Sequence, residues 1–164
     1  MATRSIELHV EVPLAFGAAR ESLQRVVSEL GQGAPGRNSL AVYLRDLHIA
    51  VRGEIRVPVA MEITDHPARF ECAISIRAAS NEGYFPRFEG TLSITPVATQ
   101  SEVWLQGAYV PPWGFVGDVL DRTVLRNAAR RSLQAFLQRI AEDITGDERE
   151  REERYIRDIR GLHN

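Results

Sequence analysis

PPWGFVGDVLDRTVLRNAARRSLQAFLQRIAEDI, residues 111–144, is the segment from which the fold of this chain can be inferred. After its two prolines a helical pattern continues for about eight turns, roughly 42 Å at 1.5 Å per residue. Apolar residues recur along it at steps of three and four, which places them on one helix face: Val119, Leu125, Ala128, Ala129, Leu133, Phe136, Leu137, Ile140 and Ile144. The pattern predicts one long amphipathic helix that covers a sheet.

The chain before this helix is organised in shorter elements. Residues 5–12 alternate between apolar and polar side chains and predict a half-buried strand. A helical pattern opens at Pro13 and ends at Gly31, and Gly17 is expected to divide it into two short helices. Further runs with a period of two follow, at 40–52, 55–63, 70–77, 88–95 and 102–110. The first of these fits either one bent strand or two short strands. Because short turns join consecutive strands, we expect an antiparallel meander and an α+β fold.

Length and composition narrow the classes of function. At 164 residues the chain can bury a core, and its formal charge of −2 gives no basic surface for nucleic acid. The sequence has no signal-peptide pattern and no apolar run of about twenty residues, so we expect a soluble, cytoplasmic protein without stable membrane insertion. The single cysteine, Cys72, excludes an internal disulfide. Every cationic side chain is arginine, which excludes lysine-based Schiff-base chemistry.

Two domain segments are predicted: residues 1–145 form the folded domain, and residues 146–164 form a charged C-terminal extension. Charges of both signs alternate in the extension, and Tyr155, Ile156 and Ile159 form a weak apolar stripe, which suggests a solvated helix. The extension is either a solvated surface without a special role or a partner-binding segment. A homodimer is left open.

The sequence contains one apparent nucleotide-binding motif and four possible metal-binding histidines, but their positions do not support either kind of site. Residues 31–36 spell GxGxxG, but they follow a helix and precede a strand, and Pro35 removes a backbone donor. The four histidines are scattered, so no metal site is predicted. We therefore expect no cofactor.

The inward faces of the predicted strands are almost wholly apolar, so no strand supplies a convincing group for acid–base catalysis. Tyr109 is the best inward polar side chain, and Asp118 and Arg122 are the best polar candidates from the long helix. Asp118 and Arg122 form either a surface ion pair or a polar group at the mouth of a pocket. No catalytic residue is assigned. The candidate ligand-binding residues are Val57, Met61, Phe70, Cys72, Ile74, Phe88, Leu92, Tyr109, Val116, Asp118, Leu120, Arg122 and Val124.

The run FPRFEGTLSITPVATQSEVWLQGAYVPPWGFVGDVLDRTVL, residues 85–125, followed by the long helix, resembles the START-like, helix-grip superfamily (SRPBCC). This superfamily includes birch-pollen allergens, lipid-transfer START domains and bacterial polyketide cyclases. The resemblance covers residues 5–144 and implies a curved antiparallel sheet wrapped around the C-terminal helix, with a hydrophobic cavity between them. It assigns no catalytic residue to a particular position, and a shared fold does not give a shared reaction.

Three functions remain open. The first is binding or carriage of a hydrophobic small molecule such as a lipid, polyketide or aromatic metabolite. The second is a polyketide cyclase/dehydratase-type enzyme that uses Tyr109, Asp118 and Arg122. The third is a protein with a filled interior that acts through surface protein–protein contacts. The apolar stripe is interrupted in the first half of the long helix, so we expect a pocket beneath residues 115–124 and an anchor formed by residues 125–144.

Overall fold

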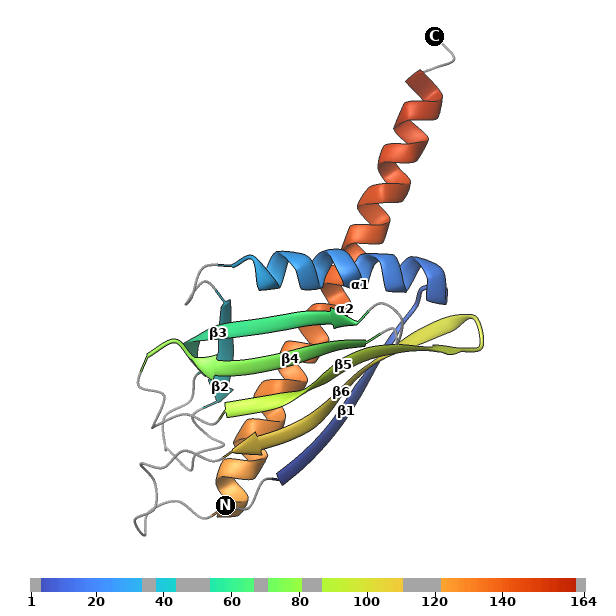
Figure 1. The fold of residues 1–164 in the computed structure, drawn as a ribbon. Helices are drawn as coiled ribbons and strands as arrows, with labels where there is room; N and C mark the ends of the chain where they lie inside the picture. The colour runs from blue at the N-terminus through green and yellow to red at the C-terminus, as the bar shows by residue number, and fades with distance from the viewer. Residues whose placement is uncertain are drawn as a thin grey trace.

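A computed structural model describes residues 4–33, 38–43, 54–66, 71–80, 87–110 and 122–161. In chain order the elements are β1 (Arg4–Val12), α1 (Phe16–Gly31), β2 (Asn38–Tyr43), β3 (Glu54–His66), β4 (Glu71–Ala78), β5 (Arg87–Val97), β6 (Gln100–Val110) and α2 (Arg122–Gly161). The predicted α+β class is confirmed (Figure 1).

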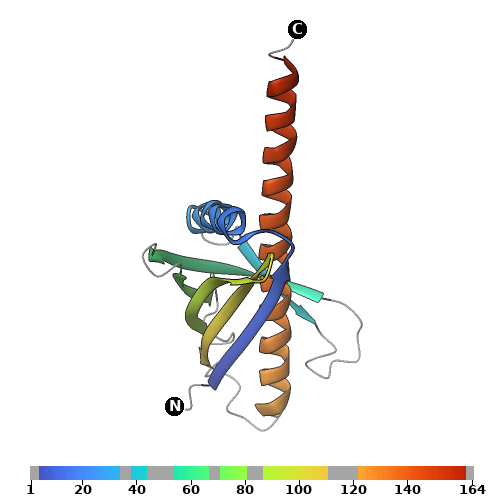
Figure 2. The ribbon, with the colours of Figure 1, turned by 90° about the vertical axis from the view of Figure 1, so that its right-hand side faces the viewer.

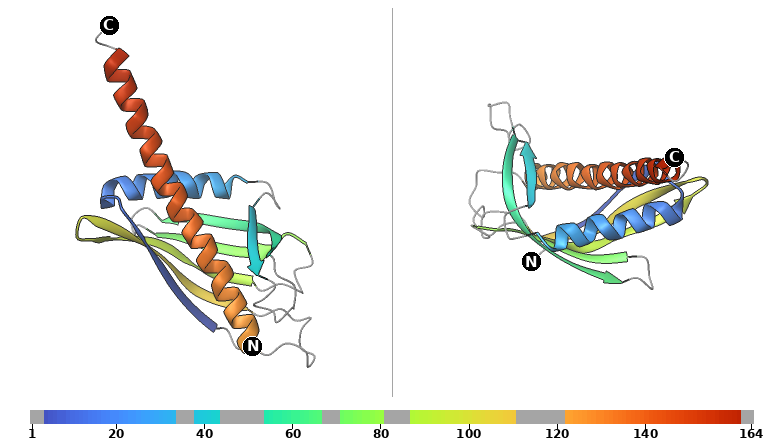
Figure 3. Two further views of the ribbon diagram at one scale, coloured as in Figure 1. Left: turned by 180° about the vertical axis from the view of Figure 1, so that it is seen from behind. Right: turned by 90° about the horizontal axis from the view of Figure 1, so that it is seen from above.

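All strands belong to one antiparallel sheet with the order β1-β6-β5-β4-β3-β2. The meander from β2 to β6 is therefore extended by β1, which pairs with the last strand although it comes first in the chain. The sheet curls, and α2 contacts both edge strands, β1 and β2 (Figures 2 and 3). A curved sheet gripping the C-terminal helix is the predicted helix-grip architecture.

The expectation of two short helices after β1 is wrong. One helix, α1, runs from Phe16 to Gly31, and Ala15 precedes it in an extended conformation. Gly17 is the second residue of α1, where the backbone N–H groups have no helical acceptor in any case. A glycine at that position does not interrupt the helix. α1 packs against α2 and against the sheet.

The inner face of the sheet and one face of α2 form the core. Every second residue of β4 from Cys72 is buried, and Val103, Leu105 and Tyr109 are buried in β6, as the period of two predicts. On α2 the predicted stripe is buried from Ala128 to Ile144. α2 continues as a helix through Gly146 to Gly161. No helix in the described part of the chain is long and apolar enough to cross a membrane.

Candidate functional site

The predicted ligand-binding residues that the structure describes share one face of the sheet. Val57, Met61, Cys72, Ile74, Phe88, Leu92 and Tyr109 are all buried there. Phe70, Val116, Asp118 and Leu120, and the side chains of Arg122 and Val124, lie outside the described residues, and so does the predicted pocket beneath residues 115–124. The apolar wall of the site is thus in place, while the ligand-binding role of these residues stays a prediction.

One row of this wall starts at Tyr109, the residue before the last of β6, and Figure 1 shows that this end of β6 lies near the first turns of α2. The strand register places Tyr109 beside Phe88, Phe88 beside Ile76, and Ile76 beside Met61, across β6, β5, β4 and β3. All four side chains are buried. They form a continuous strip in which the Tyr109 hydroxyl is the polar group.

The first turns of α2 bury small side chains. Ala128, Ala129 and Ser132 are buried and share one face of the helix, whereas the later turns bury larger residues such as Phe136 and Ile140. Small side chains fill less of the space between a helix and a sheet. The described first turns of α2 therefore present small side chains to the interior.

Two hydroxyl groups are buried without a hydrogen-bond partner in the described part of the chain. Tyr109 is 2% exposed and Ser132 is 6% exposed, and neither hydroxyl has a hydrogen-bond partner among the residues that the structure describes. A buried polar group without a partner costs about 1–3 kcal/mol, and most such groups in proteins are paired. Ser132 was missed in the sequence, where the available signal was a polar residue inside the apolar stripe between Ala129 and Phe136.

Next to Tyr109 the sheet carries a pair of glycines. Gly90 of β5 and Gly107 of β6 are direct neighbours in the register, and the Phe88 ring covers both of them. Its Cζ atom lies 2.7 Å and 2.8 Å from the positions that a Cβ atom would take at Gly90 and Gly107. The ring occupies the recess that the missing side chains leave, as aromatic residues do over glycines in other sheets. Phe88 therefore takes the space beside Tyr109 that side chains at positions 90 and 107 would otherwise occupy.

A small pocket lies at the seam between β2 and α2, away from this row. It has a volume of about 160 Å³, and its lining includes Leu40, Phe136 and Arg139. Arg139 closes one side, since its Nη2 donates a hydrogen bond of 2.8 Å to the carbonyl oxygen of Ser39. Drug-sized ligands occupy sites of about 300 Å³ or more, so this pocket is too small for them.

The two described carboxyl groups whose pKa values are shifted, Asp143 and Asp147, lie where α2 passes α1 rather than inside the sheet. Burial raises the pKa of Asp143, an effect that Arg139 opposes and Glu142 and Glu29 reinforce. Burial also acts to raise the pKa of Asp147, but the hydrogen bond and charge of Arg25 outweigh it and hold that pKa below its usual value. No group of three or more His, Cys, Asp or Glu residues in the described ranges could hold a metal ion. These carboxyl groups therefore belong to the contact between helices.

No protein-family model and no curated protein matches the sequence, but solved structures match the fold. Protein TTHA0849 from Thermus thermophilus aligns over 88% of this chain and 99% of its own, with a TM-score of 0.56 and 16% identity. Ara h 8.0201 aligns over 90% and 98%, with a TM-score of 0.52 and 10% identity. The ZhuI aromatase/cyclase from Streptomyces sp. R1128 aligns over 92% and 96%, with a TM-score of 0.51 and 14% identity. At these identities the likeness concerns the fold, which is the helix-grip fold expected from the sequence.

Proposed function

We propose that this protein binds a hydrophobic small molecule between the start of α2 and the row formed by Met61, Ile76, Phe88 and Tyr109. The observation that carries the proposal is the hydroxyl of Tyr109, which is buried and has no hydrogen-bond partner in the described part of the chain. A ligand with one polar group would supply the missing partner, and its apolar part would contact the surrounding side chains.

The chemistry of the wall narrows the ligand class. The described row carries no charged side chain, so a charged group placed against it would lose its hydration without a counter-ion. An uncharged molecule with a hydroxyl or carbonyl group fits better. Lipids, polyketides and aromatic metabolites all include such molecules. The same fold in an aromatase/cyclase is consistent with a small-molecule site, although it assigns no reaction to this chain.

Native mass spectrometry of freshly purified protein tests for a ligand directly, because a tightly bound molecule is retained as a mass adduct. A matched pair of probes, 2-naphthol and naphthalene, then tests the role of Tyr109. They differ by one hydroxyl group. A hydrogen bond is worth about 0.5–1.5 kcal/mol, so we expect 2-naphthol to bind the wild-type protein roughly 2- to 12-fold more tightly than naphthalene.

Tyr109→Phe should remove most of that preference while leaving naphthalene binding unchanged. Ser132→Ala serves as the second variant, since Ser132 is the other unpaired hydroxyl in the described interior. If neither probe binds and no adduct is found, the ligand proposal is wrong. A filled interior that acts through surface contacts would then be favoured, with the Phe88 ring over Gly90 and Gly107 as part of the filling.

A further inference from the structure

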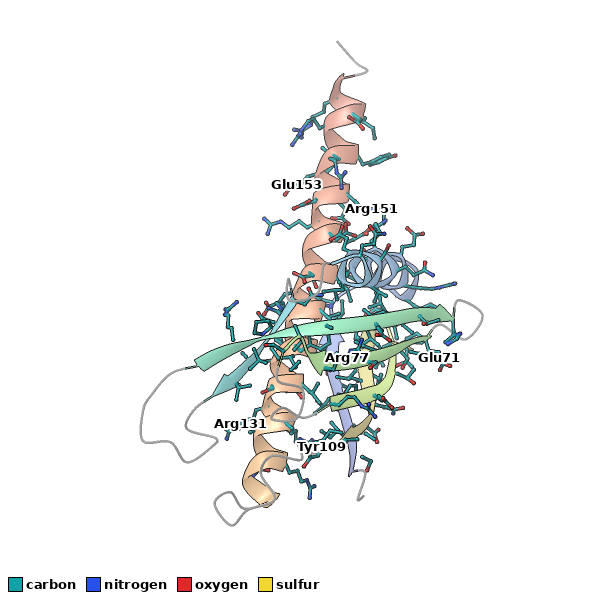
Figure 4. All side chains as sticks on the ribbon, turned by 60° about the vertical axis from the view of Figure 1, so that its left-hand side comes forward. Glu71, Arg77, Tyr109, Arg131, Arg151 and Glu153 are labelled. Carbon is teal, nitrogen blue, oxygen red and sulfur yellow. The ribbon has the colours of Figure 1, made fainter. Side chains whose placement is uncertain are left out.

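The last turns of α2 leave the folded body. Arg25 of α1 binds Asp147, and Arg151 binds Glu21 of α1 at 3.1 Å. Beyond Arg151 every residue from 152 to 160 is exposed, over about 14 Å of helix. Figures 1 and 2 show this segment, in red, extending away from the sheet and α1. In Figure 4 Arg151 lies on the side of α2 that faces α1, and Glu153 lies on another side.

The exposed segment carries three large apolar side chains. Tyr155, Ile156 and Ile159 are 68%, 50% and 40% exposed, and their spacing places them on one face of the helix. A short helical segment gains little stability in water unless an apolar face is packed against a neighbour. This face has no neighbour within the described part of the chain.

Charge along the segment changes sign. Within residues 152–160, Glu152 and Glu153 stand at the start of the segment, and Arg157 and Arg160 stand in its second half. Two copies of residues 152–160 laid antiparallel would place Glu152 of each helix against Arg160 of the other, and Arg154 against Asp158. A parallel arrangement would place like charges together. A surface that is complementary to itself when reversed is the requirement for a two-fold symmetric contact.

We propose that the α2 segment 152–160 pairs antiparallel with the same segment of a second copy of this chain. Tyr155, Ile156 and Ile159 form the seam, and the pairs Glu152–Arg160 and Arg154–Asp158 set the direction. A groove of about 670 Å³ at the base of the segment is bordered by Arg25, Glu148 and Tyr155 and accepts the end of the partner helix. The contact is short and belongs to the weak class of interfaces, below about 1,200 Å² of buried surface.

Sedimentation equilibrium of the full chain at up to about 0.5 mM, a range suited to weak interfaces, measures the association. The expected result is a monomer–dimer equilibrium in the wild type and at least about a tenfold higher dissociation constant for Ile156→Glu, which places a charge in the seam. Val97→Glu is the matched control, because Val97 is 45% exposed, close to the 50% of Ile156, but lies in the β5–β6 hairpin. It should leave the dissociation constant unchanged.

Charge reversal tests the pairing independently. Glu152→Arg/Glu153→Arg and Arg157→Glu/Arg160→Glu should each weaken self-association, and a mixture of the two variants should restore it. Direction is read from disulfide cross-linking, in which Glu152→Cys should link to Arg160→Cys in a mixture and not to itself. A wild type that stays monomeric, an equal effect of Val97→Glu, self-linking of Glu152→Cys, or a mixture that stays monomeric would overturn the proposal.

Discussion

Replacing Gly107 by alanine should destabilise the protein strongly, although the change adds a single methyl group in the interior of a strand. The added Cβ would overlap the carbonyl oxygen of Glu89 and lie 2.5 Å from the Cα atom of Gly90 and 2.8 Å from Cζ of Phe88. The first two neighbours are backbone atoms of β5, so rotation of a side chain cannot relieve the overlap. The two central strands would have to separate.

The cost follows from the kind of atom that is displaced. Overpacking a well-packed interior costs about 1–3 kcal/mol, and a rigid backbone neighbour places Gly107→Ala at the upper end of that range, about 3 kcal/mol. For a chain of this size such a loss lowers the melting temperature by about 6–12 °C. Gly90→Ala should behave alike, because its Cβ would overlap the carbonyl oxygen of Gln106 and lie 2.8 Å from the Cα atom of Gly107.

Matched glycine-to-alanine changes provide the controls. Gly17 in α1 and Gly146 in α2 have no atom within 4 Å of the position of an added Cβ. Alanine in a helix interior is favoured over glycine by about 0.5–1 kcal/mol, so Gly146→Ala should raise the free energy of unfolding, and Gly17→Ala in the first turn of α1 should not lower it. Thermal and urea unfolding of all four variants, followed by circular dichroism, gives the comparison.

A further variant separates the ring from the backbone. Gly107→Ala combined with Phe88→Ala removes the ring contact but retains the overlap with Glu89, so the added alanine at 107 should remain destabilising in that background. If Gly107→Ala unfolded at the same temperature as Gly17→Ala, the close approach of β5 and β6 would not exist in solution. If Phe88→Ala fully relieved the effect, the backbone overlap would not be its cause.

The remaining predictions concern α2. Phe136→Ala should lower the free energy of unfolding by about 3–5 kcal/mol because the ring is buried. Leu120→Ala is predicted from the sequence to change ligand uptake more than stability. If urea unfolding showed equal losses of stability for the two variants, the predicted division of the long helix into a pocket half and an anchor half would be wrong. Asp147→Asn should lower the free energy of unfolding by about 0.5 kcal/mol at neutral pH, because the lowered pKa of Asp147 means that folding favours the charged carboxylate. The difference in free energy of unfolding between the variant and the wild type should vanish as the pH falls through that pKa. Asp143→Asn should instead raise the free energy of unfolding at neutral pH, because the raised pKa of Asp143 means that its carboxylate disfavours folding above that pKa. Unfolding of both variants is measured across about pH 2–8, a range that spans the usual carboxyl pKa values. If both substitutions changed the free energy of unfolding in the same direction at neutral pH, this assignment would be wrong.

Local patterns in the sequence were enough to identify the residues of most strands and the side chains that face inward, because a period of two or of 3.6 is a property of neighbouring residues. The buried positions of β4 and β6 and the stripe from Ala128 to Ile144 follow from these periods. The family resemblance supplied the helix-grip arrangement of these elements. The sequence also predicted that Gly17 would divide the first helix, which is wrong, because a glycine in the first turn does not interrupt a helix.

Only the tertiary structure shows which residues distant in the chain lie next to each other. β1 pairs with β6 although the meander from β2 to β5 and α1 lie between them in the sequence, Gly90 meets Gly107, and Phe88 covers both. The missing partner of the Tyr109 hydroxyl among the described residues and the exposure of Tyr155 and Ile156 are likewise properties of the folded surroundings. Strand partners and burial depend on contacts between residues far apart in the sequence, and a local pattern does not encode them.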